Sequence, residues 1–355
     1  MRVGIAGAGA IALASAAWMA NRNHEVALWS PRNNTADALR DKPLVCGGVL
    51  DASYRVGVVD SAEGLAEQAD VLLIAVPANG HRAVFDKLLP HLRNGQLVIV
   101  SSMSSLSSLY LYESATTRGI SIEVASFGST VLTARRESAA HVRIMTQRKS
   151  LGVSCLPRSA QQRAISTCQA LFGDVFTADE NALSTALTNI NPVAHGPLAL
   201  LNWTRIERGE SWPQYQFMTQ RVAAVIEQLD AERIAVASAF GLQVRSIERH
   251  FLLSFGTSAE RLVDIAAELH EKRGGPPGPI EIQTRFLTED VPFGLVFTLA
   301  MSRLAKVPTP ATAATAAMAG VVIGVDFSAA NDLLPTFGLA GESVDGLLSR
   351  VNVDR

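Results

Sequence analysis

The feature that most constrains this chain is its beginning, where an apolar strand runs into a Gly-x-Gly-x-x-Ala turn and then into a helix. Gly7 permits a tight exit from the strand, Gly9 lets backbone amides approach a pyrophosphate, and Ala12 lets the helix pack close to the sheet. The helix presents the amides of Ala10 and Ile11, with the positive end of its dipole, to phosphate groups. The order strand, turn, helix therefore predicts a dinucleotide-binding site.

Residues 1–180 alternate short apolar runs with amphipathic segments, a pattern typical of a parallel sheet covered by helices on both faces. Strands are expected over residues 2–6, 25–29, 71–76, 97–101, 121–125, 142–146 and 152–155, and helices over residues 10–22, 62–67, 81–92 and 106–118. Val76 and Pro77 end the third of these strands at the carboxyl edge of the sheet, where ligands bind. They are candidate cofactor contacts, although a structural turn explains Pro77 equally well.

From residue 181 the strand-like runs vanish and helical periods take over, at residues 217–240, 246–253, 259–272, 295–305 and 311–323. The expected fold class is α/β plus all-α: a doubly wound Rossmann domain over residues 1–180, followed by a helical catalytic domain over residues 181–355. The Gly274–Pro279 loop can be neither helix nor strand, and serves either as a connector or as a border of the active site. Val307–Val325 is as long as a membrane helix, but Pro308 and Pro310 interrupt it, so we expect a buried helix.

Charge and cysteine usage exclude several classes of protein. The net charge is -2, with both signs interspersed, so we expect no nucleic-acid or membrane partner. The 3 cysteines form no Cys-x-x-Cys pair and the 7 histidines show no metal-ligand spacing, which favours reduced thiols and no metal. Because the first strand starts at Arg2, we expect no signal peptide and a cytoplasmic location.

The second strand favours NADP(H) over NAD(H). In a Rossmann unit this strand usually ends in an acidic residue that binds the ribose hydroxyls. Here it ends in Ser30-Pro31-Arg32, and no acidic residue occurs between Glu25 and Asp37. Ser30 can donate a hydrogen bond to a 2'-phosphate and Arg32 can form an ion pair with it. The alternative is that Arg32 is only a solvated loop residue.

Two segments of the helical half contain candidate catalytic groups. Asn191 and His195 are four residues apart, which places them on one face of a helix. Pro192 suits the first helical position after an Asn cap, whereas Pro197 would kink the helix. Asp290 lies where helical propensity breaks. A carboxylate that holds a histidine in one tautomer and stabilises its protonated form makes it a general acid and base, although a lone histidine is more often a core or cap residue.

Several longer motifs extend over nearly the whole chain. They are the amino-terminal turn, Ala-Val-Pro at 75–77, Asn-Pro-Val-Ala-His at 191–195, the helical segment 228–233, Arg-Phe-Leu-Thr-Glu-Asp-Val-Pro-Phe-Gly-Leu-Val at 285–296 and Val-Pro-Thr-Pro at 307–310. Together they resemble the octopine and nopaline dehydrogenases, the opine dehydrogenase family. The resemblance implies a Rossmann domain joined to a helical catalytic domain, with His195 as acid and base, Asp290 orienting it and Asn191 lining the site.

The resemblance also implies the reaction: an amino acid and a 2-oxo acid condense to an imine, which is then reduced. Arg135 matches the family's arginine near residues 133–136, and Arg285 lies five residues before Asp290, so both are candidates to bind substrate carboxylates. The alternative for each is an ordinary surface salt bridge. The Phe127–Thr130 segment departs from the family pattern. A homodimer is expected through the Ala-rich helices near the carboxyl end, which could equally pack against each other.

Two other readings stay open. One is a reductase of the ketopantoate or 3-hydroxy acid type, which shares the domain arrangement but generally uses a catalytic lysine in the helical domain. Only Lys272 and Lys306 occur there, neither in a comparable setting. The other is a non-catalytic NADP(H) sensor, against which the set of Asn191, His195 and Asp290 argues.

Overall fold

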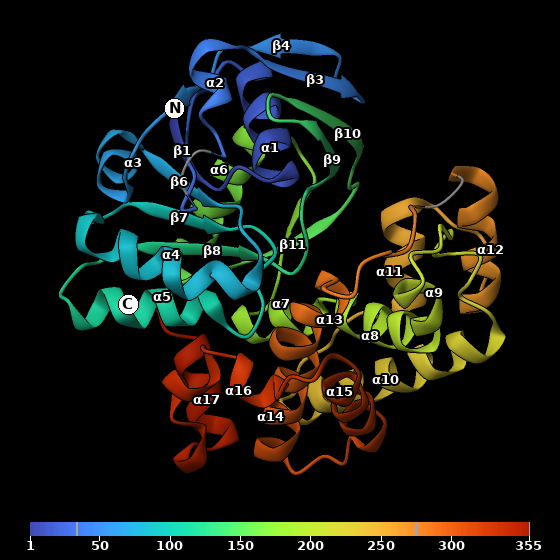
Figure 1. Ribbon diagram of the computed structural model, residues 1–355. Helices are drawn as coiled ribbons and strands as arrows, with labels where there is room; N and C mark the ends of the chain where they lie inside the picture. Colours follow the sequence, from blue (N-terminus) through green and yellow to red (C-terminus); the bar gives the residue numbers. More distant parts are fainter. Residues whose placement is uncertain (33–34, 274–275, 355) are drawn as a thin grey trace. The chain divides into compact units, whose positions relative to one another are not determined.

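The apolar run that opens the chain forms an inner strand of a mostly parallel sheet, between the strands Val71–Ile74 and Glu25–Trp29. The computed structural model describes residues 1–32, 35–273 and 276–354. The sheet is built from β1 (Arg2–Ala6), β2 (Glu25–Trp29), β5 (Gly57–Val58), β6 (Val71–Ile74), β7 (Leu97–Val100), β8 (Glu123–Phe127), β11 (Leu151–Leu156) and β12 (Phe176–Ala178). Its eight strands have the order β12-β11-β8-β7-β6-β1-β2-β5, and β11 runs antiparallel to β8 (Figure 1). The doubly wound Rossmann sheet is thus confirmed.

A second sheet, which the sequence analysis did not anticipate, has the strand order β4-β3-β10-β9. Its strands are β3 (Leu44–Gly48), β4 (Ala52–Tyr54), β9 (Leu132–Ser138) and β10 (His141–Gln147). Only β10 was expected. β3 ends in two glycines and β9 carries Arg, Arg, Glu and Ser, so neither has the apolar alternation by which strands are recognised.

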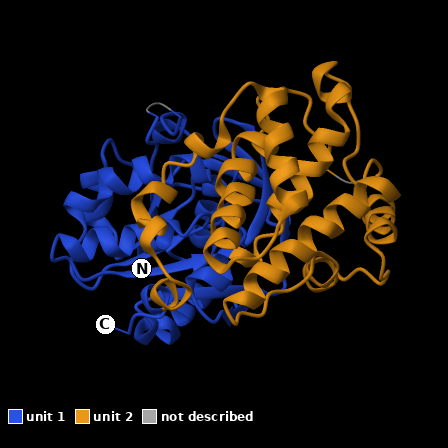
Figure 2. Cartoon of the chain, turned by 90° about the horizontal axis from the view of Figure 1, so that it is seen from below, with its two compact units in different colours: residues 1–186, 349–355 blue, residues 187–348 orange. Residues whose placement is uncertain are grey.

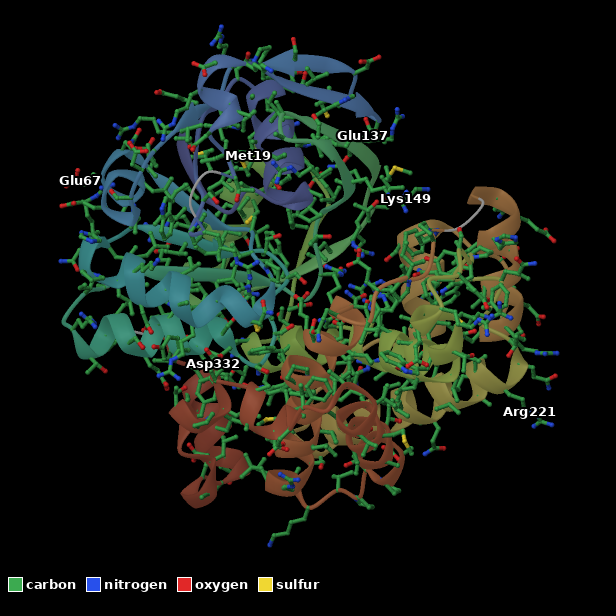
Figure 3. All side chains as sticks on the ribbon, viewed as in Figure 1. Met19, Glu67, Glu137, Lys149, Arg221 and Asp332 are labelled. Carbon is green, nitrogen blue, oxygen red and sulfur yellow. The ribbon has the colours of Figure 1, made fainter. Side chains whose placement is uncertain are left out.

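The first helix, α1 (Ala10–Asn21), lies between the two sheets. It contacts β2 of the large sheet and β3, β4, β9 and β10 of the small one. Its residues are apolar nearly all round, as expected of a helix buried on several sides. Met19, labelled in Figure 3, is fully buried, whereas Glu137 of β9 lies on the outer side of the small sheet.

The other helices of this half cover both faces of the large sheet. α6 (Gln161–Phe172) packs beside α1, while α3 (Ala62–Gln68), α4 (His81–Leu88) and α5 (Ser107–Thr117) lie side by side on the opposite face (Figure 1). This half also contains four short helical elements: α2 (Ala38–Asp41) and the 3₁₀ turns η1 (Ala78–Gly80), η2 (Leu89–His91) and η3 (Arg158–Ala160).

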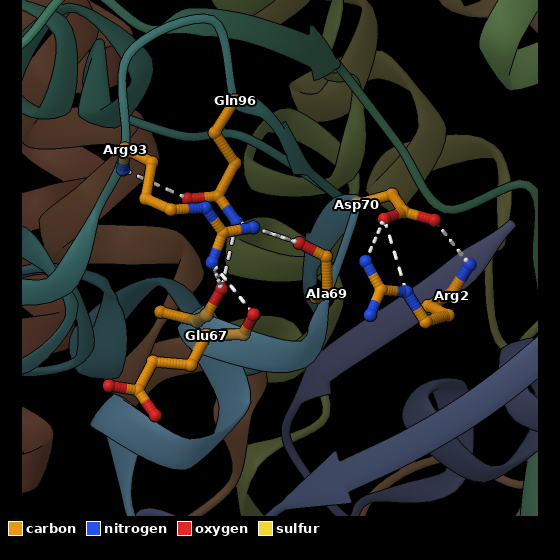
Figure 4. A network of polar contacts seen from close by, with 7 residues as sticks. Arg2, Glu67, Ala69, Asp70, Arg93 and Gln96 are labelled. Carbon is orange, nitrogen blue, oxygen red and sulfur yellow. Dashed lines mark hydrogen bonds and ion pairs between the residues drawn. The ribbon is translucent and has the colours of Figure 1, made fainter.

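A polar network fixes the junction between α3 and β6 (Figure 4). The Arg93 guanidinium donates to the carbonyls of Ala66 at 2.6 Å, Glu67 at 2.8 Å and Ala69 at 2.7 Å. A cation at the carboxyl end of a helix is favoured by the helix dipole. Beside it, Arg2 donates to Asp70 through Nε at 3.2 Å and Nη2 at 2.6 Å. Together these bonds hold the start of β6 beside β1.

The described chain divides into two compact units, drawn in separate colours in Figure 2. Unit 1 comprises Met1–Ala186 with Ser349–Arg355, and unit 2 comprises Leu187–Leu348. This division differs from the expected boundary between residues 180 and 181, and it returns the end of the chain to unit 1. Within that unit, Arg350 forms two hydrogen bonds with Glu113, at 2.7 and 2.8 Å.

Unit 2 is helical. Its helices, with those at its borders, are α7 (Ala182–Thr188), α8 (Asn191–Leu201), α9 (Trp203–Glu207), α10 (Gln220–Ala239), α11 (Ile247–Phe255), α12 (Leu262–Arg273), α13 (Arg285–Thr288), the π-helical turn η4 (Val291–Leu295), α14 (Val296–Ala305), α15 (Pro310–Ile323), α16 (Phe327–Ala330), η5 (Leu334–Phe337), η6 (Leu339–Gly341) and α17 (Val344–Val351). Within the described ranges no helix has the length and hydropathy that crossing a membrane requires.

Of the Gly274–Pro279 loop, Gly274 and Gly275 lie outside the described residues. The remainder packs on a buried tryptophan: the Gly278 amide donates to the Trp212 carbonyl at 2.7 Å, and the Trp212 indole donates to the Pro279 carbonyl at 3.0 Å. A Cβ on Gly278 would lie 2.3 Å from the indole ring. These contacts give that part of the loop a packing role within unit 2.

α10 runs through the core of unit 2 and carries buried charges, all within the 228–233 motif. Arg233 donates to Asp230 at 2.7 and 3.0 Å, to the Arg245 carbonyl at 2.6 Å and to the Leu187 carbonyl. The other Asp230 oxygen accepts from the Ile247 amide at 2.9 Å. The motif is therefore explained by packing within unit 2.

Replacing Asp230 with Asn should lower the free energy of unfolding by about 3–5 kcal/mol, because the Arg233 charge would stay in the core without its carboxylate. The exposed pair of Arg261 and Asp264 has the same three-residue spacing, so Asp264→Asn is the matched control and should cost less than about 1 kcal/mol. Urea unfolding followed by circular dichroism measures both. Similar losses in the two variants would contradict the importance of burial.

Candidate active site

The turn after β1 has the geometry that its glycines predict. Gly7 has φ of 137°, and its amide donates to the Trp29 carbonyl at 2.8 Å. A Cβ there would lie 2.4 Å from the Ala75 carbonyl oxygen and 3.3 Å from the Ala12 Cβ, so the close approach of these segments requires glycine.

Beside this turn there is room for a phosphate group. Gly9 is the residue before the first turn of α1, and a Cβ built on it would meet no atom of the described chain within 4 Å. The first amides of α1, those of Ala10 and Ile11 among them, have no partner within the helix. Free amides, a helix dipole and open space at Gly9 fit a dinucleotide pyrophosphate.

The end of β2 lies next to this turn, since β2 pairs with β1. Ser30 is half-buried and Arg32 is exposed. The two residues that follow, 33 and 34, lie outside the described part of the chain. Ser30 and Arg32 therefore remain candidates for the adenosine ribose, with no acidic side chain in the segment that could repel a 2'-phosphate.

At the end of β6, the segment of Val76 and Pro77 is held by a histidine that the sequence analysis missed. His81 is fully buried; its Nε2 lies 3.1 Å from the Val76 carbonyl and its Nδ1 lies 2.9 Å from the Ser107 hydroxyl. Burial lowers the pKa of His81 to about 4, so the ring is neutral at neutral pH. Nε2–H then donates to Val76 and Nδ1 accepts from Ser107. No sequence spacing indicated that His81 and Ser107 would form a hydrogen bond.

In unit 2 the two predicted catalytic groups meet. His195 Nδ1 lies 2.8 Å from Asp290 Oδ2, and their side chains are 14% and 9% exposed. Because a carboxylate only accepts hydrogen bonds, Nδ1 carries the hydrogen, and Nε2 of the neutral ring has a lone pair. Among the residues that the structure describes, none bonds to Nε2. The arrangement gives one oriented nitrogen that can take up and return a proton.

Phe286 fixes the plane of the His195 ring. The two rings are parallel to within 2° and their centroids lie 3.8 Å apart. Phe286 belongs to α13, where the Thr284 hydroxyl accepts its amide hydrogen at 3.3 Å. The sequence analysis quoted Phe286 within a motif but assigned it no function.

A close approach of α8 and η4 brings the histidine and the aspartate together. A Cβ on Gly294 would lie 2.1 Å from Cγ of Pro192, so only glycine fits against that ring. The Asn331 side chain donates to the Pro292 carbonyl at 2.8 Å and is fully buried. Asp290 directly precedes η4, and π-helical turns occur frequently at functional sites.

The other predicted residues are placed as follows. Asn191 is the first residue of α8 rather than its cap, since the residue before the helix is Ile190, and the Asn189 side chain accepts the Asn191 amide at 3.1 Å. Pro197 lies inside α8, which continues to Leu201. Arg285 is exposed and lies 3.9 Å from Glu289.

Arg135 belongs to the exposed outer face of the small sheet in unit 1, opposite Arg143 of β10.

No group of three or more potential metal ligands occurs in the described ranges.

Comparison with known proteins shows the family. The sequence model of a family described as "NAD/NADP octopine/nopaline dehydrogenase, alpha-helical domain" matches residues 178–323, and that of "Ketopantoate reductase PanE/ApbA" matches residues 3–157. The chain is 30% identical to the opine dehydrogenase of Arthrobacter sp. (strain 1C) over 343 residues, 95% of each chain. It belongs to the opine dehydrogenase family.

Solved structures show the same fold. Octopine dehydrogenase with NADH and L-arginine has a TM-score of 0.80 at 18% identity, covering 99% of this chain and 98% of that one. Yersinopine dehydrogenase with NADP⁺ bound has a TM-score of 0.71 at 16% identity, covering 99% and 98%. This opine dehydrogenase family member is therefore an NAD(P)-dependent oxidoreductase with a Rossmann domain and a helical domain.

Replacing Phe286 with Ala should lower kcat by about 2- to 10-fold, because an aromatic pair contributes about 0.5–1.5 kcal/mol and here holds the His195 ring in plane. Phe286→Tyr keeps the stacked ring and should retain kcat. Steady-state turnover with saturating substrates measures both. A Tyr variant as slow as the Ala variant would show that stacking does not position His195.

Proposed function

We propose that this enzyme catalyses the reversible reductive condensation of an amino acid with a 2-oxo acid through an imine, and that it prefers NADP(H). The observation that carries the proposal is the 2.8 Å hydrogen bond between His195 Nδ1 and Asp290. It leaves Nε2 as an oriented acid–base group, which amine condensation and imine reduction require.

His195 performs the proton transfers in this mechanism. Its Nε2 accepts a proton from the ammonium group of the amino acid, so that the free amine can attack the carbonyl carbon of the oxo acid and form a C–N bond. The addition leaves an extra proton on the substrate nitrogen, which moves to the alkoxide oxygen and makes it a hydroxyl. The same nitrogen of His195 then returns its proton to that hydroxyl, which leaves as water and yields the protonated imine. Asp290 keeps Nδ1 protonated throughout and stabilises the imidazolium.

A bound reduced nicotinamide would supply the hydride for the carbon of the protonated imine, and the product would be a secondary amine with two carboxylates. Arg285 and Arg135 are proposed to bind the substrate carboxylates, because guanidinium groups pair with carboxylates in a two-pronged geometry. Asn191, one helical turn before His195, is proposed to line the site.

A panel of amino acids crossed with pyruvate, 2-oxoglutarate and glyoxylate tests the reaction, with NADPH oxidation as the readout. We expect oxidation only where both substrates are present. His195→Ala should lower kcat by about 10²- to 10⁴-fold, with the Kd of NADPH unchanged.

Three outcomes would contradict the proposal. Oxidation of NADPH with an oxo acid alone would favour a reductase of the ketopantoate type, and cofactor binding without turnover across the panel would favour a sensor. Unchanged kcat in the His195→Ala variant would remove the histidine from the chemistry.

The reductase alternative has less support in the helical half. The ketopantoate reductase match covers residues 3–157, which is the Rossmann half that both enzyme classes share. Of the two lysines in the helical half, Lys272 forms an ion pair with Glu268, and Lys306 is an exposed residue at the end of α14.

The proposed preference for NADP(H) rests on Ser30, Arg32 and the missing acidic residue after β2. Arg32→Met should lower kcat/KM with NADPH by about 10- to 100-fold, since a hydrogen bond to a charged group contributes about 1.5–3 kcal/mol, and leave kcat/KM with NADH nearly unchanged. Arg118→Met removes an equal charge at the end of α5 and should change neither value. A clear preference of the unmodified enzyme for NADH would contradict the assignment.

The assembly and the location of the enzyme stay predictions. A homodimer is supported by Met318, Val321 and Val325, which are 56%, 77% and 40% exposed on and just after the Ala-rich α15. A cytoplasmic location is supported by three buried, free cysteines.

A further inference from the structure

One guanidinium joins the two loops of the dinucleotide site. Arg136, on β9, donates from Nη1 to the carbonyl of Ala8 at 3.1 Å and from Nη2 to the carbonyl of Thr35 at 3.1 Å. Ala8 lies between the two glycines of the turn after β1, and Thr35 lies in the segment after β2. Arg136 thus links the pyrophosphate turn to the segment proposed to face the adenosine ribose.

The charge of Arg136 is not neutralised by an acidic side chain. Its other acceptors are the carbonyls of Ser138 at 2.9 Å and Ala139 at 3.3 Å. Over residues 1–32, 35–273 and 276–354 it forms no ion pair, unlike Arg233 and Arg350, which pair with Asp230 and Glu113. Four of the five N–H groups are used, and one hydrogen on Nη1 is left for a ligand.

The place of this charge is unfavourable without an anion. Ala8 stands two residues before α1, so the guanidinium lies next to the positive end of the helix dipole. Arg93 offers the opposite case, because it donates to carbonyls at the end of α3, where a cation is favoured (Figure 4). A phosphate at the start of α1 would offset both the dipole and the Arg136 charge.

We propose that Arg136 is a cofactor-binding residue whose guanidinium interacts with phosphate oxygens in the adenosine half of the dinucleotide. It pairs in register with Val142, which is fully buried, so both lie on the side of the small sheet that packs against α1. Arg135 and Arg143 pair on the outer side. The inference rests on the proposed function. It adds a residue of β9 to a cofactor site otherwise formed by the turn after β1 and the segment after β2.

The test measures the Kd of NADPH and NADH by isothermal titration calorimetry at several salt concentrations. Arg136→Met should weaken NADPH binding by about 10-fold or more. The remaining affinity should depend less on salt, because the variant lacks one of the charge–phosphate attractions that salt screens. An equal loss for NADH assigns the guanidinium to the pyrophosphate, and a loss confined to NADPH assigns it to the 2'-phosphate. Arg143→Met removes the same charge from the outer face and should change each Kd less than twofold.

The Arg136→Lys variant distinguishes an effect of the charge on cofactor binding from an effect on the stability of the fold. It keeps the positive charge but reaches fewer carbonyls, so its salt dependence should match that of the unmodified protein even if its thermal stability falls. The proposal is overturned if Arg136→Met binds both dinucleotides within twofold of the unmodified protein, or if its affinity falls with the salt dependence unchanged. The Kd of a dinucleotide can be measured without turnover. If no pair of amino acid and oxo acid is a substrate, the proposed function is contradicted, but the effect of Arg136 on cofactor binding can still be determined.

Discussion

The hydrogen bond between His195 and Asp290 depends on groups that lie 95 residues apart in the chain. It forms because η4 can approach the start of α8, which Gly294 permits by leaving room for the Pro192 ring. Phe286 then restricts the imidazole to one plane. α10, which carries the buried charges, packs against both α8 and α14.

The first unit meets a different constraint, since it must offer open space and free amides at the end of a packed sheet. The small sheet packs against the side of α1 that faces away from the large sheet. These contacts hold the helix in place and leave the space beside Gly9 open. His81 contributes from the other side, as a neutral buried ring that holds the carbonyl of Val76. Rigid surroundings, together with an exposed Gly9 directly before α1, fit a dinucleotide site.

Local patterns sufficed to predict much of this arrangement. The strand, turn and helix at the start of the chain were recognisable from the order of their small residues, and α10 and α15 were recognisable because both are long runs rich in helix-forming residues. The pairing of His195 with Asp290 was expected from the resemblance, since no local pattern relates two segments so far apart. β9 was missed because the run Arg135-Arg136-Glu137-Ser138 gives it no apolar alternation, and the stacking of Phe286 and the π-helical turn depend on packing that a sequence does not display.

The π-helical turn has a consequence for how this enzyme can vary. A π turn contains one residue more than an α turn, and each residue of an α-helix advances its direction by about 100°. Deleting one residue within Val291–Leu295 could restore a regular helix continuous with α14, but Asp290 would then point about a quarter-turn or more away from the imidazole. The rotation of α14 about its axis is therefore tied to the direction of one carboxylate, and a change in the length of this segment would turn Asp290 away from His195.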